Sequence, residues 1–108
     1  MTAPAFAAPM RVARDHPCLA GHFPGQPLVP AVLLLEQVAY ALRGWRGERL
    51  ARVLEAKFVA PLGPDEDARI ELEDAAPHVR FRIVAATGGI IARGIVAGQP
   101  VPVAEARG

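Results

Sequence analysis

The chain has 108 residues, of which 52% are hydrophobic and 6% aromatic, and its formal net charge is +1. This length suits one compact domain over residues 1–108, although a domain this small leaves apolar surface that oligomerisation would cover. The near-balanced charge and few aromatics give no general case for nucleic-acid binding. The only cysteine, Cys18, excludes an internal disulfide. No segment is apolar enough to cross a membrane, so we expect a cytoplasmic protein.

The first part of the chain predicts little regular structure. We expect residues 1–8 to form a loose arm and residues 10–14, which alternate weakly between apolar and basic, to form a first strand. Residues 15–21 contain Pro17 and end at a glycine, which predicts a loop.

A helix is predicted to begin after Pro30. Pro24 and Pro27 exclude a regular helix before it, whereas a proline fits the first turn because its missing N–H costs nothing there. The helix should run to about Arg43 and end near Gly44. Its apolar side chains cover most of its circumference, which predicts burial on several sides.

From Leu50 onward the apolar residues recur at every second position, the period of strands. The predicted strands lie at residues 53–58, 69–73, 79–83 and 90–96, and prolines end the order so that residues 100–108 should be flexible. One long helix with an antiparallel sheet to wrap it predicts an α+β fold.

Glu36 is the only carboxylate in this apolar helix. If it is buried, it must be paired or protonated, which is typical of an active site. The alternative is an exposed stripe, because Glu36, Tyr40 and Arg43 are spaced for one helix face.

His22 precedes the helix in a loop that three prolines stiffen. A fixed backbone suits a catalytic group, but an incidental loop histidine would look the same. His16 and His22 lack a third ligand nearby, and His78 is distant, so no metal site is predicted.

Other candidates have simpler interpretations. Cys18 has no evident base partner, so a buried residue with a packing role is a better interpretation than a nucleophile. The arginines that follow the helix either form a solvated rim or dock an acidic partner: Arg43, Arg46, Arg49 and Arg52.

The central motif resembles the signature of the 3-hydroxyacyl-acyl-carrier-protein dehydratases. The matching residues are His22-Phe23-Pro24-Gly25, Pro27, Pro30, Val32-Leu33 and Glu36. Less specific similarity extends over the lead-in loop and the later strands. The resemblance implies a hot-dog fold and a homodimer, or an oligomer of dimers, in which two sheets join. His22 of one subunit would then face Glu36 of the other.

The resemblance also implies a mechanism without metal or cofactor. The imidazole of His22 would remove the α-proton of a 3-hydroxyacyl thioester, and Glu36 would protonate the departing hydroxyl. The N–H of Ala31 would bind the thioester oxygen. The substrate would arrive on the phosphopantetheine arm of an acyl carrier protein. Further substrate contacts would come from neighbouring motif and helix positions: Phe23, Gly25, Val32 and Tyr40.

Two positions depart from the family pattern: relatives usually have glycine at Ala31 and often glutamine at Tyr40. Two other functions therefore remain open. One is a hot-dog acyl thioesterase, although such enzymes typically lack the His-Phe-Pro-Gly loop. The other is a non-catalytic, carrier-binding subunit of a hetero-oligomeric dehydratase. The acyl group, and whether it belongs to fatty-acid or polyene synthesis, is not predicted.

Overall fold

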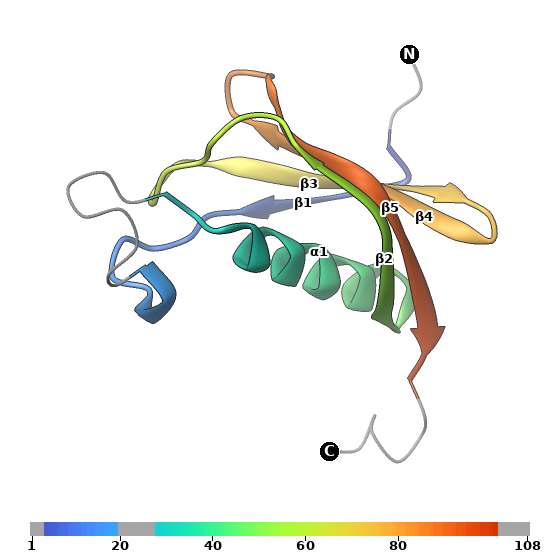
Figure 1. Ribbon diagram of the computed structural model, residues 1–108. Coiled ribbons are helices and arrows are strands. Elements are labelled where there is room, and N and C mark those ends of the chain that lie inside the picture. Colours follow the sequence, from blue (N-terminus) through green and yellow to red (C-terminus); the bar gives the residue numbers. More distant parts are fainter. Residues whose placement is uncertain (1–3, 20–27, 102–108) are drawn as a thin grey trace.

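The computed structural model describes residues 4–19 and 28–101, in which one long helix lies against one face of a curved sheet (Figure 1). The strands are β1 (Phe6–Met10), β2 (Glu48–Phe58), β3 (Ala68–Ala75), β4 (His78–Ala85) and β5 (Ile90–Pro100). The helices are α1 (Ala31–Arg46) and the short 3-10 helix η1 (Pro17–Leu19). The sheet order is β1-β3-β4-β5-β2, with every neighbouring pair antiparallel. The α+β prediction is confirmed.

The core lies between α1 and the inner face of the sheet. The helix contributes one stripe of apolar side chains, which are Leu33, Leu34, Val38, Ala41 and Leu42. The strands contribute alternate residues, among them Ile70, Leu72, Phe81, Ile83 and Val96. The period of two in the sequence therefore marks which side chains face α1. Among the described residues, no helix has both the length and the hydropathy needed to cross a bilayer.

The N-terminal expectations were wrong. The first strand is residues 6–10 rather than 10–14, and it includes part of the predicted loose arm. This strand pairs with β3 from Phe6 opposite Leu72 to Met10 opposite Ala68. Its alanines give no alternation to detect, and Pro9 is tolerated because β1 is an edge strand. The Phe6 ring also stacks on Trp45 of α1, with centroids 6.2 Å apart.

The helix passes through Gly44 and ends at Arg46, beyond the predicted end. Gly47 ends it, because its left-handed backbone (φ 67°) lets its N–H donate to the carbonyl of Arg43 at 2.9 Å. Trp45, packed on Phe6, gives the last turn a buried contact that Gly44 alone does not predict.

The last strand is also longer than expected. β5 reaches Pro100, because it pairs with β2 from Phe58 opposite Ala92 to Glu48 opposite Pro100. The predicted flexible segment thus began too early, and residues 102–108 lie outside the described part. β2 has two register shifts, between Leu50 and Arg52 and between Val53 and Glu55. Such bulges bend and twist a strand.

Candidate functional site

Three of the predicted site residues lie outside the described residues: His22, Phe23 and Gly25. The site is therefore built from the segment that follows them. Leu28, Val29 and Pro30 lead into α1, and the N–H of Val29 donates to the carbonyl of Leu62 at 2.8 Å. This hydrogen bond fixes the start of the helix against the loop that follows β2.

The first turn of α1 leaves amide groups available. The carbonyl of Pro30 accepts from the amides of Leu33 at 3.0 Å and Leu34 at 3.3 Å. Within residues 4–19 and 28–101, the N–H groups of Ala31 and Val32 have no backbone acceptor, and no side chain caps the helix. Because the helix dipole makes this end positive, it favours a developing negative charge.

A cavity of about 230 Å³ lies at the same end of α1. The helix side contributes Leu28 to Ala31 and Leu34, and the strand side contributes Phe58 and Ala60 to Leu62. Its lining side chains are apolar throughout. The cavity therefore suits an apolar group whose polar end lies beside the first amides of the helix.

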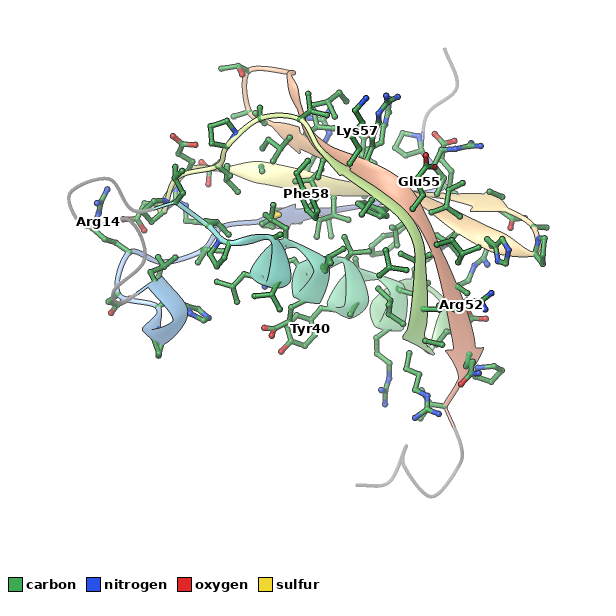
Figure 2. The ribbon with its side chains drawn as sticks, in the orientation of Figure 1. Arg14, Tyr40, Arg52, Glu55, Lys57 and Phe58 are labelled. Atoms are coloured by element: carbon green, nitrogen blue, oxygen red, sulfur yellow. The ribbon has the colours of Figure 1, made fainter. Side chains whose placement is uncertain are left out.

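The outer face of α1 carries Val32, Glu36 and Tyr40, all exposed in the single chain. Val32 is 66% exposed and Tyr40 64%, and Figure 2 shows Tyr40 directed away from the sheet. The prediction that α1 is buried on several sides was therefore wrong for one chain. In the described part of the chain, Glu36 makes no ion pair or hydrogen bond with another side chain.

The long edge strand β2 also exposes apolar side chains. Val53 is 39% exposed, Leu54 42% and Phe58 45%, and Val59, just after the strand, is 54% exposed. A long edge strand with an apolar surface is normally covered by another strand, because its free backbone groups otherwise recruit unrelated chains.

The arginines predicted to dock a carrier protein differ in their surroundings. Arg43 is exposed on α1, whereas Arg46 lies 4.1 Å above the Trp45 ring and forms an ion pair with Asp74 at 3.0 Å. Arg49 lies on β2 and donates a hydrogen bond to Gln99. Arg43, Arg49 and Arg52 are exposed, whereas Arg46 is half-buried.

Sequence reasoning missed the residues that close the cavity opposite the helix. Phe58 was identified only as the end of a predicted strand, and Leu62 lay between two predicted strands. The available signal was the proline after the strand, since Pro61 restricts the backbone of the residue before it and lies in the segment that lines the cavity. In the described residues, no three His, Cys, Asp or Glu side chains gather as a metal site.

Comparison with protein families decides what this arrangement belongs to. Residues 2–95 match the model of the ApeI-like family, described as ApeI dehydratase. The chain belongs to the ApeI-like dehydratase family. The resemblance inferred from the central motif is confirmed at this level.

Curated relatives of this ApeI-like chain carry the name 3-hydroxyacyl-[acyl-carrier-protein] dehydratase FabZ. The protein from Haemophilus influenzae (strain PittEE) is 34% identical over 93 residues, covering 77% of this chain and 62% of the relative. That from Chlamydia trachomatis serovar L2 is 33% identical over 110 residues, covering 91% and 67%. The chain thus spans about two thirds of the length of these relatives.

Two solved structures share the fold of this ApeI-like chain. The dehydratase heterocomplex ApeI:P from Xenorhabdus doucetiae matches with a TM-score of 0.73 at 21% identity, over 85% of this chain and 84% of that one. An uncharacterized protein from Erwinia carotovora subsp. atroseptica gives 0.74 at 24% identity, over 88% and 82%. The predicted hot-dog fold is thereby confirmed.

Proposed function

We propose that this protein dehydrates a 3-hydroxyacyl thioester, carried on an acyl carrier protein, to the trans-2-enoyl thioester. The observation that carries the proposal is Glu36, a carboxylate without a partner in the described chain on the exposed face of α1. It stands in a chain of a dehydratase family, five residues after a helix start with available amides.

The proposed reaction needs one base, one acid and one group that binds an oxyanion. His22 takes the α-proton, and the electron pair of that C–H bond becomes the new carbon–carbon double bond. The β-carbon loses its hydroxyl, which Glu36 protonates so that it leaves as water. The N–H of Ala31 stabilises the negative charge on the thioester oxygen, and the helix dipole strengthens this effect.

The acyl chain is proposed to enter the cavity between α1 and the end of β2. Val32 and Tyr40 contact the substrate from the outer face of the helix, and Phe23 and Gly25 of the sequence motif complete the site. No metal or organic cofactor is required, because both proton transfers use side chains. Arg43 and Arg49 offer exposed positive charge to an acidic carrier protein.

The proposed assembly is a homodimer joined through β2. Pairing two copies along this edge would satisfy its free backbone groups and cover Val53, Leu54 and Phe58. In such a dimer, His22 of one subunit acts with Glu36 of the partner, and each chain contributes to two sites.

A second candidate is a subunit that acts only together with another hot-dog protein. It is favoured by one observation: the Xenorhabdus structure that shares this fold is a heterocomplex. The exposed β2 edge would serve a different partner as well as a second copy. Full activity of the purified homodimer alone would rule out this candidate.

The test is to incubate the purified protein with 3-hydroxyacyl thioesters of several chain lengths on carrier protein and to measure 2-enoyl product. We expect Glu36→Gln and His22→Ala to lower kcat by about 100-fold or more. Asp15→Asn removes an exposed carboxylate outside this site and should leave the rate unchanged. Unaltered turnover in the two site variants would contradict the mechanism, and release of free thiol would identify a thioesterase.

A further inference from the structure

The face of the sheet that points away from α1 is strongly basic. Partners in an antiparallel register place their side chains on the same face. By this register, β2, β4 and β5 direct six cationic side chains outward: Arg49, Arg52, Lys57, Arg80, Arg82 and Arg93. The same strands direct one carboxylate outward, that of Glu55. The whole chain has 12 basic and 11 acidic residues, so the basic residues are concentrated on this face of the sheet rather than spread evenly.

Like charges meet at the centre of this face. Lys57 lies directly opposite Arg93, and Arg93 lies directly opposite Arg82 on the next strand. Like charges at directly opposed positions destabilise a sheet. The arrangement therefore costs stability in the isolated chain, unless a negative group lies above it.

Among the outward-facing cations, the carboxylates of β3 neutralise only those of the strand beside it, β4. Glu71 accepts hydrogen bonds from Arg69 and Arg82, and Glu73 lies 3.6 Å from Arg80. No carboxylate of the described residues lies within 4.0 Å of the Lys57 ammonium or the Arg93 guanidinium. Positive charge thus remains on the side formed by β2 and β5.

The two uncompensated cations, Lys57 and Arg93, line a groove together with two arginines that are paired with β3. This groove of about 300 Å³ is lined by four cationic side chains and one carboxylate: Lys57, Arg80, Arg82, Arg93 and Glu55. Figure 2 shows Lys57 and Glu55 on the side of the sheet opposite α1. A concave surface of one sign concentrates the field and attracts counter-charges.

We propose that this basic groove, defined by Lys57, Arg80, Arg82 and Arg93, binds an acidic segment of a partner protein. Arginine binds carboxylates with paired N–H donors, and cations on three adjacent strands, about 5 Å apart, match successive acidic side chains. A nucleic acid fits less well, because the outer positions of these strands hold no Phe, Tyr or Trp on which bases could stack. The inference rests on charge and register alone, independently of the proposed reaction.

The test compares two double variants that change the net charge equally. Lys57→Gln/Arg93→Gln removes the uncompensated cations of the groove, whereas Arg11→Gln/Arg14→Gln removes exposed cations that pair with Asp67 and Asp65 elsewhere. The probe is a fluorescent peptide of ten glutamates, and its anisotropy is measured with each full-length protein at low salt. A glutamine peptide of equal length gives the baseline.

We expect the groove variant to bind the glutamate peptide about fivefold more weakly and the control variant to bind within twofold of the parent protein. Added salt should weaken binding by the parent protein. Equal weakening in both variants, or no binding by the parent, would overturn the proposal. Tighter binding of a single-stranded oligonucleotide that the groove variant abolishes would overturn it in favour of nucleic acid.

Discussion

Ala31, the first residue of α1, and Phe58, the last residue of β2, line the same cavity. One belongs to the positive end of a helix and the other to an exposed edge strand. A ligand in this cavity would have an amide donor at one end and an aromatic ring in its apolar wall. An acyl thioester suits this arrangement, because its carbonyl oxygen accepts hydrogen bonds and its acyl chain is apolar.

Ala31→Pro should separate catalysis from folding. Proline fits this first helical position, and Pro30 already has the extended backbone (φ −70°, ψ 155°) that a following proline demands. The substitution deletes the N–H proposed to bind the thioester oxygen, so we expect kcat to fall by about 100-fold or more with little change in Tm. Ala31→Gly keeps the N–H and should keep most of the activity. Equal rates for the proline and glycine variants would show that this amide is not the donor.

The edge strand gives a prediction about assembly. Leu54 lies at a bulge of β2 and is 42% exposed, so Leu54→Arg places a charge where a second copy would pair. We expect the parent protein to sediment as a dimer and the variant as a monomer with reduced activity. Thr87→Arg, at the exposed β4–β5 turn, should remain dimeric. A parent protein that is monomeric at all concentrations would refute the proposed interface.

The ion pairs of Glu71 should make the free energy of unfolding depend on pH. Hydrogen bonding from Arg69, opposed in part by burial and assisted by Arg82, lowers the pKa of Glu71 below its usual 4.5. Because the folded pKa is below the unfolded one, the stabilisation is fully present above pH 4.5 and is lost as the pH falls through the folded value. Glu71→Gln should cost about 1–2 kcal/mol at pH 7.

The comparison with the parent protein tests the sign of this effect. The difference in the free energy of unfolding between parent and Glu71→Gln, measured in urea, should shrink below pH 4.5. Glu73→Gln is the control, because this carboxylate lies 3.6 Å from Arg80 and is more exposed, so a smaller cost is expected. A difference that stayed constant with pH would mean that the carboxylate charge is not what stabilises the fold.

Two glycines should respond to alanine in opposite directions. A Cβ at Gly94 would lie 2.0 Å from the carbonyl oxygen of Glu55 and 2.7 Å from the Phe81 ring, so Gly94→Ala must displace β2. We expect a loss of about 3 kcal/mol or more in the free energy of unfolding. A Cβ at Gly44 meets nothing within 4 Å, and Gly44→Ala should stabilise α1 by about 0.5–1 kcal/mol. Thermal unfolding of both variants distinguishes these outcomes, and a neutral Gly94→Ala would contradict the described packing.

The sequence predicted the elements whose signals are local. Alternation marked β2 to β5, and Pro30 marked the start of α1, because these patterns act within a few residues. The failures all involve contacts between distant residues. β1 exists because β3 offers it an edge, and α1 continues past Gly44 because Trp45 packs on Phe6. Single-sequence patterns carry no information about such partners.

The residues of the candidate site also divide into those with a local sequence signal and those that depend on contacts between distant segments. Glu36 and Ala31 could be proposed as site residues because a carboxylate in an apolar helix and a motif departure are visible in the sequence. Phe58 was missed because its role depends on how the end of β2 meets the start of α1. The outward sorting of the arginines was missed as well, since the two bulges in β2 shift its alternation and decide which side chains share a face.

The two bulges also limit which strands of other molecules can pair with the edge of β2. Two irregularities within one strand give β2 a curvature that a straight extended peptide cannot follow over its full length. A strand with the same bend, such as β2 of a second copy, can follow it. The exposed edge of β2 therefore permits pairing with a matching strand. It disfavours fibril growth, which requires flat and regular strands that can stack repeatedly.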